Sequence, residues 1–253
     1  MHQFLTASGA FPGKRAVYDA IRRGQVTVDD TVTTNPLYRL RPGRRLVCWK
    51  GEPLEYAPEK TYLLLNKPEG VLCSRLSGRD RLLGKKSVYG LLAEAGVDEK
   101  TLNSLFCVGR LDEDTCGLLI LSSDGRLCHQ ITNPRHGITK TYHAVLDKPL
   151  DDETVRRIEA GVTITLEEDG RATSYHTRGC SIRMDGRSRD KVFITLSEGR
   201  KREVRRIFEA VGWRVLALKR TAVGGLCLSD LKLRKGGLKQ SAREYIQEKV
   251  GLG

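Results

Sequence analysis

Short apolar runs bounded by glycine, proline and polar residues recur along the chain and predict β-strands. The run at residues 117–121 is typical of a buried strand, because it is too short for an ordinary helix. The same pattern predicts further strands at residues 62–65, 141–146, 192–196 and 214–218. Helices are predicted at residues 151–160, just after Pro149, and at residues 201–211. Strands and helices that mix without strict alternation indicate an α+β fold.

The first 55 residues have the pattern of a small separate module. Two helices and two strands are predicted there, at residues 3–8, 14–23, 25–28 and 45–49. Asp29 and Asp30 predict a turn between strands. The proline-bounded segment 53–58 predicts a linker into a larger second domain. The predicted domains are therefore residues 1–57 and 58–253.

Basic residues are in clear excess over the 253-residue chain, with 44 Lys and Arg against 31 Asp and Glu and a net charge of +13. Such an excess favours polyanionic partners, although a basic enzyme with a small-molecule substrate could have the same composition. No apolar segment approaches the ~20 residues that span a bilayer, so no membrane association is expected. The N-terminal segment lacks the pattern of a secretory signal, and a cytoplasmic location is expected.

Cysteine and histidine are scattered through the sequence. No two of the 7 cysteines have the close spacing of a structural zinc site. Unpaired cysteines of this kind are typical of a reducing compartment. We therefore expect neither a metal site nor disulfide bonds.

The segment 109–125 combines a charged pair with the start of a core element. Arg110 and Asp112 are two positions apart, which places both side chains on one face of an extended segment. The buried strand predicted at 117–121 follows at once, and functional groups are commonly held at such strand ends. Asp114 has the character of an ordinary turn residue, and by itself Asp112 could be another.

Two further segments, residues 131–142 and 197–225, follow the segment 109–125 along the chain and support a functional role for it. Together the three segments resemble the motifs of the pseudouridine synthases of the RsuA type, which modify ribosomal RNA. Three ordered motifs are hard to obtain by chance. The resemblance extends from about residue 3 to the basic C-terminal tail, and residues 1–57 resemble an S4 RNA-binding domain. It implies a catalytic domain with a mixed, largely antiparallel central sheet flanked by helices.

The resemblance also implies a chemistry that needs no cofactor. The bond between C1′ and N1 of a uridine is broken, the uracil turns, and C5 is joined to C1′. Asp112 stands at the family position of the single catalytic carboxylate. It would either attack C1′ or remove the 2′ proton, and the sequence leaves both routes open.

Further site residues are carried over from the family motifs. Arg205 matches the arginine that pairs with the catalytic aspartate, although Arg110 shares a face with Asp112 and competes for this role. Arg110 is then expected to enter the RNA helix in place of the flipped nucleotide. Tyr142 matches the tyrosine that stacks on the uracil, and Leu218 is expected to contact its other side. As isolated strand residues, both would otherwise be assigned to the core.

Two groups of basic residues are expected to contact RNA phosphates. One lies along the second predicted helix and consists of Lys14, Arg15, Arg22 and Arg23. The other crowds the start of the helix at 201–211, where cations are ordinarily disfavoured, and consists of Arg200, Lys201 and Arg206. The family often has Gln at the position of Glu203. The tail at 232–249 is either an RNA-contacting extension or a mobile end.

The leading hypothesis is a monomeric pseudouridine synthase that acts on ribosomal RNA or a pre-ribosomal particle. The segment 131–142 and the pair Gly224–Gly225 resemble the small-subunit enzymes more than the large-subunit ones. The alternatives are a non-catalytic RNA-binding or ribosome-assembly factor with the same fold, and a basic enzyme acting on a small molecule. A pure binding protein would not need Asp112 in a cleft, and a small-molecule enzyme would not need the S4-like module.

Overall fold

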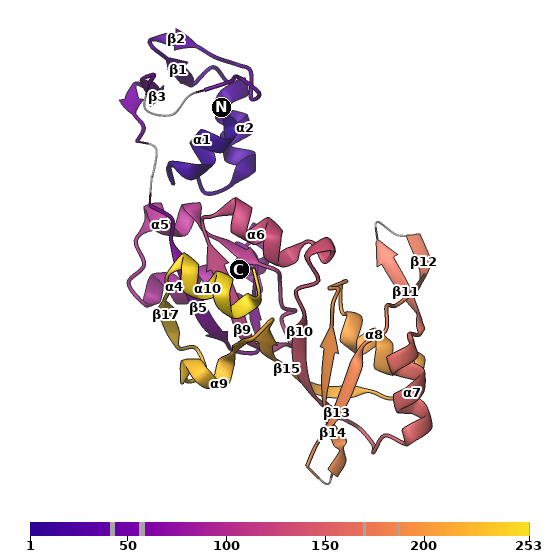
Figure 1. Cartoon of the computed structure of the whole chain (residues 1–253). Helices are drawn as coiled ribbons and strands as arrows, with labels where there is room; N and C mark the ends of the chain where they lie inside the picture. The colour runs from indigo at the N-terminus through magenta and orange to yellow at the C-terminus, as the bar shows by residue number, and fades with distance from the viewer. Residues whose placement is uncertain (41–43, 56–58, 169–170, 187, 253) are drawn as a thin grey trace.

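The computed structural model describes residues 1–40, 44–55, 59–168, 171–186 and 188–252. An N-terminal unit, at the top of Figure 1, consists of two helices beside a small antiparallel sheet of strand order β2-β1-β3-β4. Its elements are α1 (His2–Ala7), α2 (Lys14–Arg22), β1 (Val26–Val28), β2 (Thr31–Val32), β3 (Val47–Trp49) and β4 (Glu52–Pro53). The two helices and two strands predicted in this region are confirmed. The end of the predicted linker, with the boundary at 57/58, lies outside the described residues.

This unit has its own apolar core, in which Leu5 and Ile21 of the helices pack against Val26 of the sheet. The predicted turn is present, and both Asp29 and Asp30 adopt positive φ, at 47° and 63°. Asp29 compensates for this conformation because its carboxylate accepts hydrogen bonds from the Leu46 N–H at 2.9 Å and from Arg45 at 2.8 Å. Aspartate is one of the few residue types that tolerate such angles when the side chain bonds locally.

The remaining chain is built on a twisted sheet of strand order β13-β14-β10-β15-β9-β5-β17, with β8 beside β9 and β16 beside β15. Its strands are β5 (Tyr62–Lys67), β8 (Phe106–Val108), β9 (Cys116–Ser122), β10 (Lys140–Leu146), β13 (Ser181–Asp185), β14 (Ser188–Leu196), β15 (Val215–Val223), β16 (Leu226–Cys227) and β17 (Leu238–Gln240). Within the described residues, the pairing of β9 with β15 is the one parallel pairing in this sheet. The prediction of an α+β fold with a mixed, largely antiparallel sheet is therefore confirmed.

Helices cover the sheet at both ends of the strand order (Figure 1). They are α4 (Val88–Glu94), α5 (Glu99–Ser104), α6 (Gly125–Thr132), α7 (Asp152–Ala160), α8 (Glu203–Ala210), α9 (Leu228–Leu231) and α10 (Arg243–Val250). Strand β5 is buried on both faces, because Leu64 packs with α6 and α10 while Leu63 and Leu65 pack with α4. A separate core lies between α7, α8 and the β10–β14 half of the sheet.

Short elements complete the chain and were not resolved by the sequence pattern. Residues 71–87 contain β6 (Val71–Leu72), α3 (Gly78–Leu82) and β7 (Lys86–Ser87). A hairpin of β11 (Thr163–Glu168) and β12 (Arg171–His176) extends beyond α8, and the 3₁₀ turn η1 (Pro134–His136) precedes β10. The C-terminal segment is not a mobile end, because Ile246 and Val250 of α10 lie in the core.

One close backbone approach fixes the parallel seam of the sheet. Gly117 of β9 pairs with Arg220 of β15 and has a φ of 108°. A Cβ atom added at Gly117 would lie 2.2 Å from the Arg220 carbonyl oxygen. Glycine is therefore required here by both conformation and space.

We expect Gly117→Ala to lower the free energy of unfolding by about 3 kcal/mol or more, because the backbone strain and the clash act together. Gly137→Ala is the matched control: Gly137 also has a positive φ, of 66°, but a Cβ there would meet no atom within 4 Å. The control should cost only about 1 kcal/mol. Urea unfolding followed by circular dichroism measures both values, and equal losses would contradict the close approach at the seam.

Candidate active site

A cleft of about 290 Å³ opens where the loop between β8 and β9 faces the segment before α8. Arg110 and Asp112 line it from the loop, and Tyr142 and Leu218 line it from β10 and β15. Arg110 and Asp112 flank Leu111, which is buried in the core, so the two charged side chains share the exposed face as predicted. Asp112 also lines an adjoining cavity with Arg205.

Lys67, at the end of β5, lies beneath the loop that carries Asp112. The ammonium group is completely buried and donates to the carbonyl oxygens of Thr115 at 2.8 Å, Pro68 at 3.0 Å and Asp112 at 3.2 Å. Burial lowers the pKa of Lys67, and nearby negative groups, Asp112 among them, oppose this shift. One cation thus binds both ends of the loop through its backbone.

Lys67 was not among the predicted site residues, because residues 66–70 have the composition of an ordinary turn. The available sign was a lysine two residues after the apolar run 62–65, since Lys is almost never fully buried without partners.

Arg205 makes a different ion pair from the predicted one. Its guanidinium lies 3.0 Å from the Asp114 carboxylate and also donates to the Asp114 carbonyl at 3.1 Å and to the Val215 carbonyl at 2.8 Å. Within the described residues, no ion pair joins Asp112 to Arg205, so the expected Asp112–Arg205 pair is corrected.

The reason for this correction is the direction of the loop. Asp114 is the residue that faces the first turn of α8, where Arg202 also approaches it, at 3.4 Å. Asp114 therefore connects the loop to α8 and is more than the turn residue expected from the sequence.

The carboxylates around the cleft differ in their partners. Asp114 pairs with two arginines, and the Glu113 carboxylate lies 2.7 Å from the ammonium of Lys85. Among the described residues, the Asp112 side chain makes neither an ion pair nor a hydrogen bond. Asp112 is thus an unpaired carboxylate on a loop held by Lys67. Arg110, Arg200 and Lys201 line the same cleft.

Tyr142 and Leu218 lie on neighbouring strands at the inner side of the cleft. Tyr142 is half-buried and opposes Arg220, while Leu218 is almost fully buried and opposes Ala144 of the same strand as Tyr142. Both side chains also belong to the core behind the cleft. They present an aromatic ring and an aliphatic group to the space in front of Asp112.

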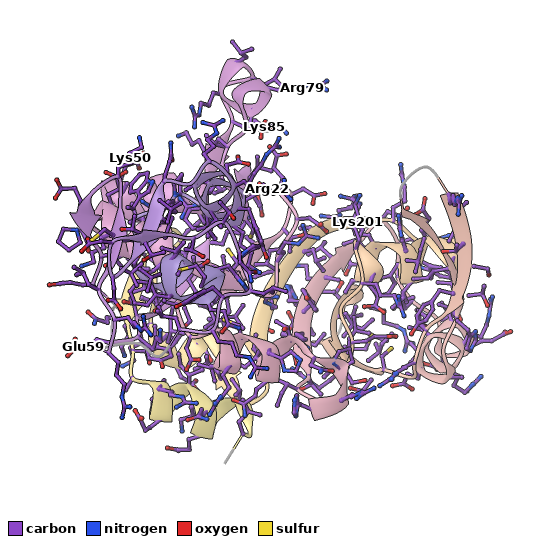
Figure 2. The ribbon with its side chains drawn as sticks, turned by 90° about the horizontal axis from the view of Figure 1, so that it is seen from above. Arg22, Lys50, Glu59, Arg79, Lys85 and Lys201 are labelled. Atoms are coloured by element: carbon purple, nitrogen blue, oxygen red, sulfur yellow. The ribbon has the colours of Figure 1, made fainter. Side chains whose placement is uncertain are left out.

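The basic residues predicted to contact RNA are distributed over two regions. Arg200 and Lys201 line the cleft, together with Arg202, whereas Arg206 lies on α8 and lines neither cavity next to Asp112. The four cations of α2 are all exposed on the N-terminal unit and do not line the cleft. Figure 2 labels Arg22, Arg79, Lys85 and Lys201 among the basic side chains and Glu59 among the acidic ones.

Two thiols lie behind the loop of Asp112. The Cys107 thiol donates to the carbonyl of Cys73 at 3.3 Å, and the Leu111 N–H donates to the Cys73 sulfur at 3.4 Å. A side-chain hydrogen bond with Cys107, together with the Leu111 N–H and the charges of Lys67 and Arg220, outweighs burial and lowers the pKa of the Cys73 thiol to about 6. No cluster of metal-ligating side chains occurs in the part of the chain that the structure describes.

Residues 61–210 match the protein family described as RNA pseudouridylate synthase. The chain belongs to this family. It is 34% identical over 248 residues to the ribosomal small subunit pseudouridine synthase A of Escherichia coli K12, covering 98% of this chain and 96% of that protein. An uncharacterized RNA pseudouridine synthase of Bacillus subtilis, YtzG, is 30% identical and covers 96% of this chain and 95% of its own.

A solved structure described as a pseudouridylate synthase agrees with this assignment. It superimposes with a TM-score of 0.65 at 26% identity and covers 98% of both chains. The protein is accordingly a pseudouridine synthase and an isomerase. Among its described helices, none is both long and apolar enough to span a membrane.

The Lys67 ammonium should be needed to hold the synthase loop. We expect Lys67→Met to lower the free energy of unfolding by about 2–4 kcal/mol, because buried carbonyl oxygens lose their donor. Amide hydrogen exchange should accelerate most at residues 112–115. Lys85→Met is the control, since it removes a partly exposed ion pair from the same loop and should cost less than ~1 kcal/mol. Unchanged exchange in the loop of the Lys67 variant would contradict this role.

Proposed function

We propose that the protein converts a specific uridine of ribosomal RNA to pseudouridine, with Asp112 as the catalytic carboxylate. The observation that carries the proposal is the unpaired Asp112 side chain on a loop held by Lys67, inside a cleft bordered by Arg110, Arg200 and Lys201. The relatives named as small-subunit enzymes support 16S-type RNA as the target. The protein would act as a monomer in the cytoplasm, on free ribosomal RNA or on a pre-ribosomal particle.

The reaction is an isomerisation and needs no group from outside the substrate. The C1′–N1 bond breaks, a C5–C1′ bond forms, and the proton lost from C5 is balanced by the proton gained at N1. Asp112 would attack C1′ or remove the 2′ proton, and each route needs a negatively charged oxygen at this point. A neutral side chain of the same shape could do neither.

The groups around Asp112 would place the base for this reaction. Tyr142 would stack on the flipped uracil, with Leu218 on the other side, because base–aromatic stacking is worth ~1–3 kcal/mol. Arg110, which is exposed at the mouth of the cleft, would occupy the space that the flipped nucleotide leaves in the RNA helix. Arg205 would act at one remove, by holding Asp114 and with it the end of the catalytic loop.

The N-terminal unit would serve as an RNA-binding domain of the S4 type, covering residues 1–57, ahead of a catalytic domain at 58–253. Its helix α2 exposes Lys14, Arg15, Arg22 and Arg23, and within the described residues these side chains make no ion pair. These cations would contact the RNA backbone.

Asp112→Asn tests the catalytic assignment. Pseudouridine formation should fall at least ~1000-fold, because the variant lacks the charge for either route, while RNA affinity should stay within a few-fold. Single-turnover assays on a small-subunit rRNA transcript measure the first quantity and filter binding the second. Asp230→Asn, an exposed aspartate on α9, is the matched control and should behave as wild type. Asp114→Asn is unsuitable as a control because Asp114 is bound to α8.

The outcomes separate the possible roles of the protein. Near-normal product formation by the Asp112 variant would overturn the mechanism. A wild-type protein that binds rRNA tightly and modifies none of it would instead indicate the assembly-factor function.

A pair of double variants tests the RNA contacts of α2. Arg22→Gln/Arg23→Gln should make the dependence of log affinity on log salt concentration less steep by about 1.5, since each lost phosphate contact removes ~0.7–0.9. Arg156→Gln/Arg157→Gln is the control, because it removes two adjacent exposed arginines from α7, far from the N-terminal unit (Figure 1). Equal salt slopes for the two double variants would contradict a phosphate-binding role of α2.

A further inference from the structure

Two glutamates form a buried carboxyl pair in the wall of the cleft. Glu198 and Glu203 are 5% and 4% exposed, and both line the cleft that contains Asp112. Both carboxyl groups meet the same residue, because the Arg200 N–H donates to Glu203 at 2.8 Å and the Arg200 Nε lies 4.0 Å from the Glu198 carboxylate. Two adjacent carboxylates cannot both keep their charge in a buried site without a large cost, so a proton between them is expected.

Glu198 has the environment of the ionised member. One carboxylate oxygen accepts from the Tyr175 hydroxyl at 2.6 Å, and the other accepts from the Arg178 N–H at 2.8 Å. Burial opposes ionisation of Glu198, but these hydrogen bonds outweigh it and lower the pKa of this carboxyl. Glu198 is therefore an acceptor on both oxygens.

Glu203 has the environment of the protonated member. Its Oε2 accepts from the Arg200 N–H at 2.8 Å, whereas its Oε1 is buried without a hydrogen-bond partner among the described residues. A buried oxygen beside a second carboxylate finds a partner only if it carries a proton that it can donate. Burial raises the pKa of Glu203 to about 7, with the Arg200 N–H opposing the shift and the charge of Glu198 adding to it.

We propose that Glu203 acts as a neutral carboxylic acid that donates its proton to Glu198, and that this bond positions the basic segment 199–202 at the cleft. The inference rests on the proposed function, because that segment would contact the RNA. Glu203 is a positioning residue: it acts through Arg200, Lys201 and Arg202 and does not itself touch the reacting atoms.

The contacts of the segment show how the pair would control it. Glu198 and Glu203 stand at its two ends, so a hydrogen bond between them would close it into a compact turn. Arg200 lies with its guanidinium 3.5 Å from the centre of the Tyr175 ring, and Arg202 adopts a positive φ of 54° while reaching Asp114. Loss of the proton would place two negative charges at the base of the turn and push its ends apart.

Other charged and titratable groups face the pair from neighbouring elements. Arg200 and Tyr175 contact Glu198, Lys140 approaches from β10, and Cys180 lies near Glu203. Burial lowers the pKa of Lys140, and Glu203 opposes that shift. Lys140 therefore responds to the charge of Glu203 and is the cation that would partly compensate an ionised pair.

The raised pKa of Glu203 makes the stability of the fold depend on pH in one direction. A carboxyl whose pKa is 4.5 in the unfolded chain and about 7 in the folded protein contributes stability that is present below pH 4.5 and is lost as the pH rises to about 7. Glu203→Gln removes this loss, because an amide keeps a donor at every pH. The variant's melting temperature relative to wild type should therefore rise with pH between about 5 and 8, by roughly 5 °C in total.

Glu209→Gln is the matched control, since Glu209 is exposed on the same helix, and its melting difference from wild type should not change with pH. Glu198→Gln is a second variant: it removes the charge that raises the pKa of Glu203, so the wild-type transition should move to lower pH. These measurements need no RNA. They decide the state of the pair even if the protein modifies no RNA tested.

The functional arm compares single-turnover rates on the small-subunit rRNA transcript at pH 6 and pH 8.5. The rate at pH 6 divided by the rate at pH 8.5 should be at least ~3-fold smaller for Glu203→Gln than for wild type and Glu209→Gln. The reason is that the Gln variant lacks the titrating proton. Glu203→Ala also lacks the titrating group, so its melting difference from wild type should change with pH in the same way, but it should be less stable than Glu203→Gln at every pH because it has no donor for Glu198. A pH-independent melting difference for Glu203→Gln would overturn the shared proton, and an unchanged rate ratio would overturn its link to the cleft.

Discussion

The site depends on one buried ammonium. Lys67 is at the end of a strand buried on both faces, and its charge is satisfied by carbonyl oxygens of the loop that carries Asp112 instead of by a carboxylate. A carboxylate partner would bind Lys67 through one side chain only, whereas several carbonyl acceptors fix the backbone of the whole loop. Asp112 can therefore be held in place while its own side chain stays unpaired.

The parallel seam between β9 and β15 brings the two halves of the catalytic unit together. The loop of Asp112 enters β9, and α8 leads into β15, so both functional segments arrive at the same edge. Arg205 reinforces the junction by donating to the carbonyl oxygens of Asp114 and Val215, one from each half. The seam needs Gly117, since a side chain there would displace Arg220. The register of β9 against β15 therefore also determines the geometry of the site.

The pattern of apolar residues predicted several of the longer strands and helices, but it missed α6 and α10, the hairpin of β11 and β12, and the short elements. The strands at β9 and β10 and the helices α2 and α7 coincide with apolar runs or amphipathic stretches that capping and turn residues bound. The elements α3, β6 and β7 are each only a few residues long, which leaves no room for a period to show. Helix α10 was missed because half of its residues are charged, although Tyr245, Ile246 and Val250 pack in the core.

The site shows the same division between what adjacency in sequence can predict and what only folding decides. Motif order was enough to bring Asp112, Tyr142 and Leu218 to one cleft, because each belongs to a strand or loop whose place follows from the topology. Motif order could not predict the ion pair of Arg205, because Asp112 and Asp114 are only two residues apart. The direction of the loop decides that Arg205 pairs with Asp114. This pairing suits the proposed role of Asp112, because the guanidinium at Asp114 fixes the loop while both oxygens of the Asp112 carboxylate stay free of protein partners among the described residues.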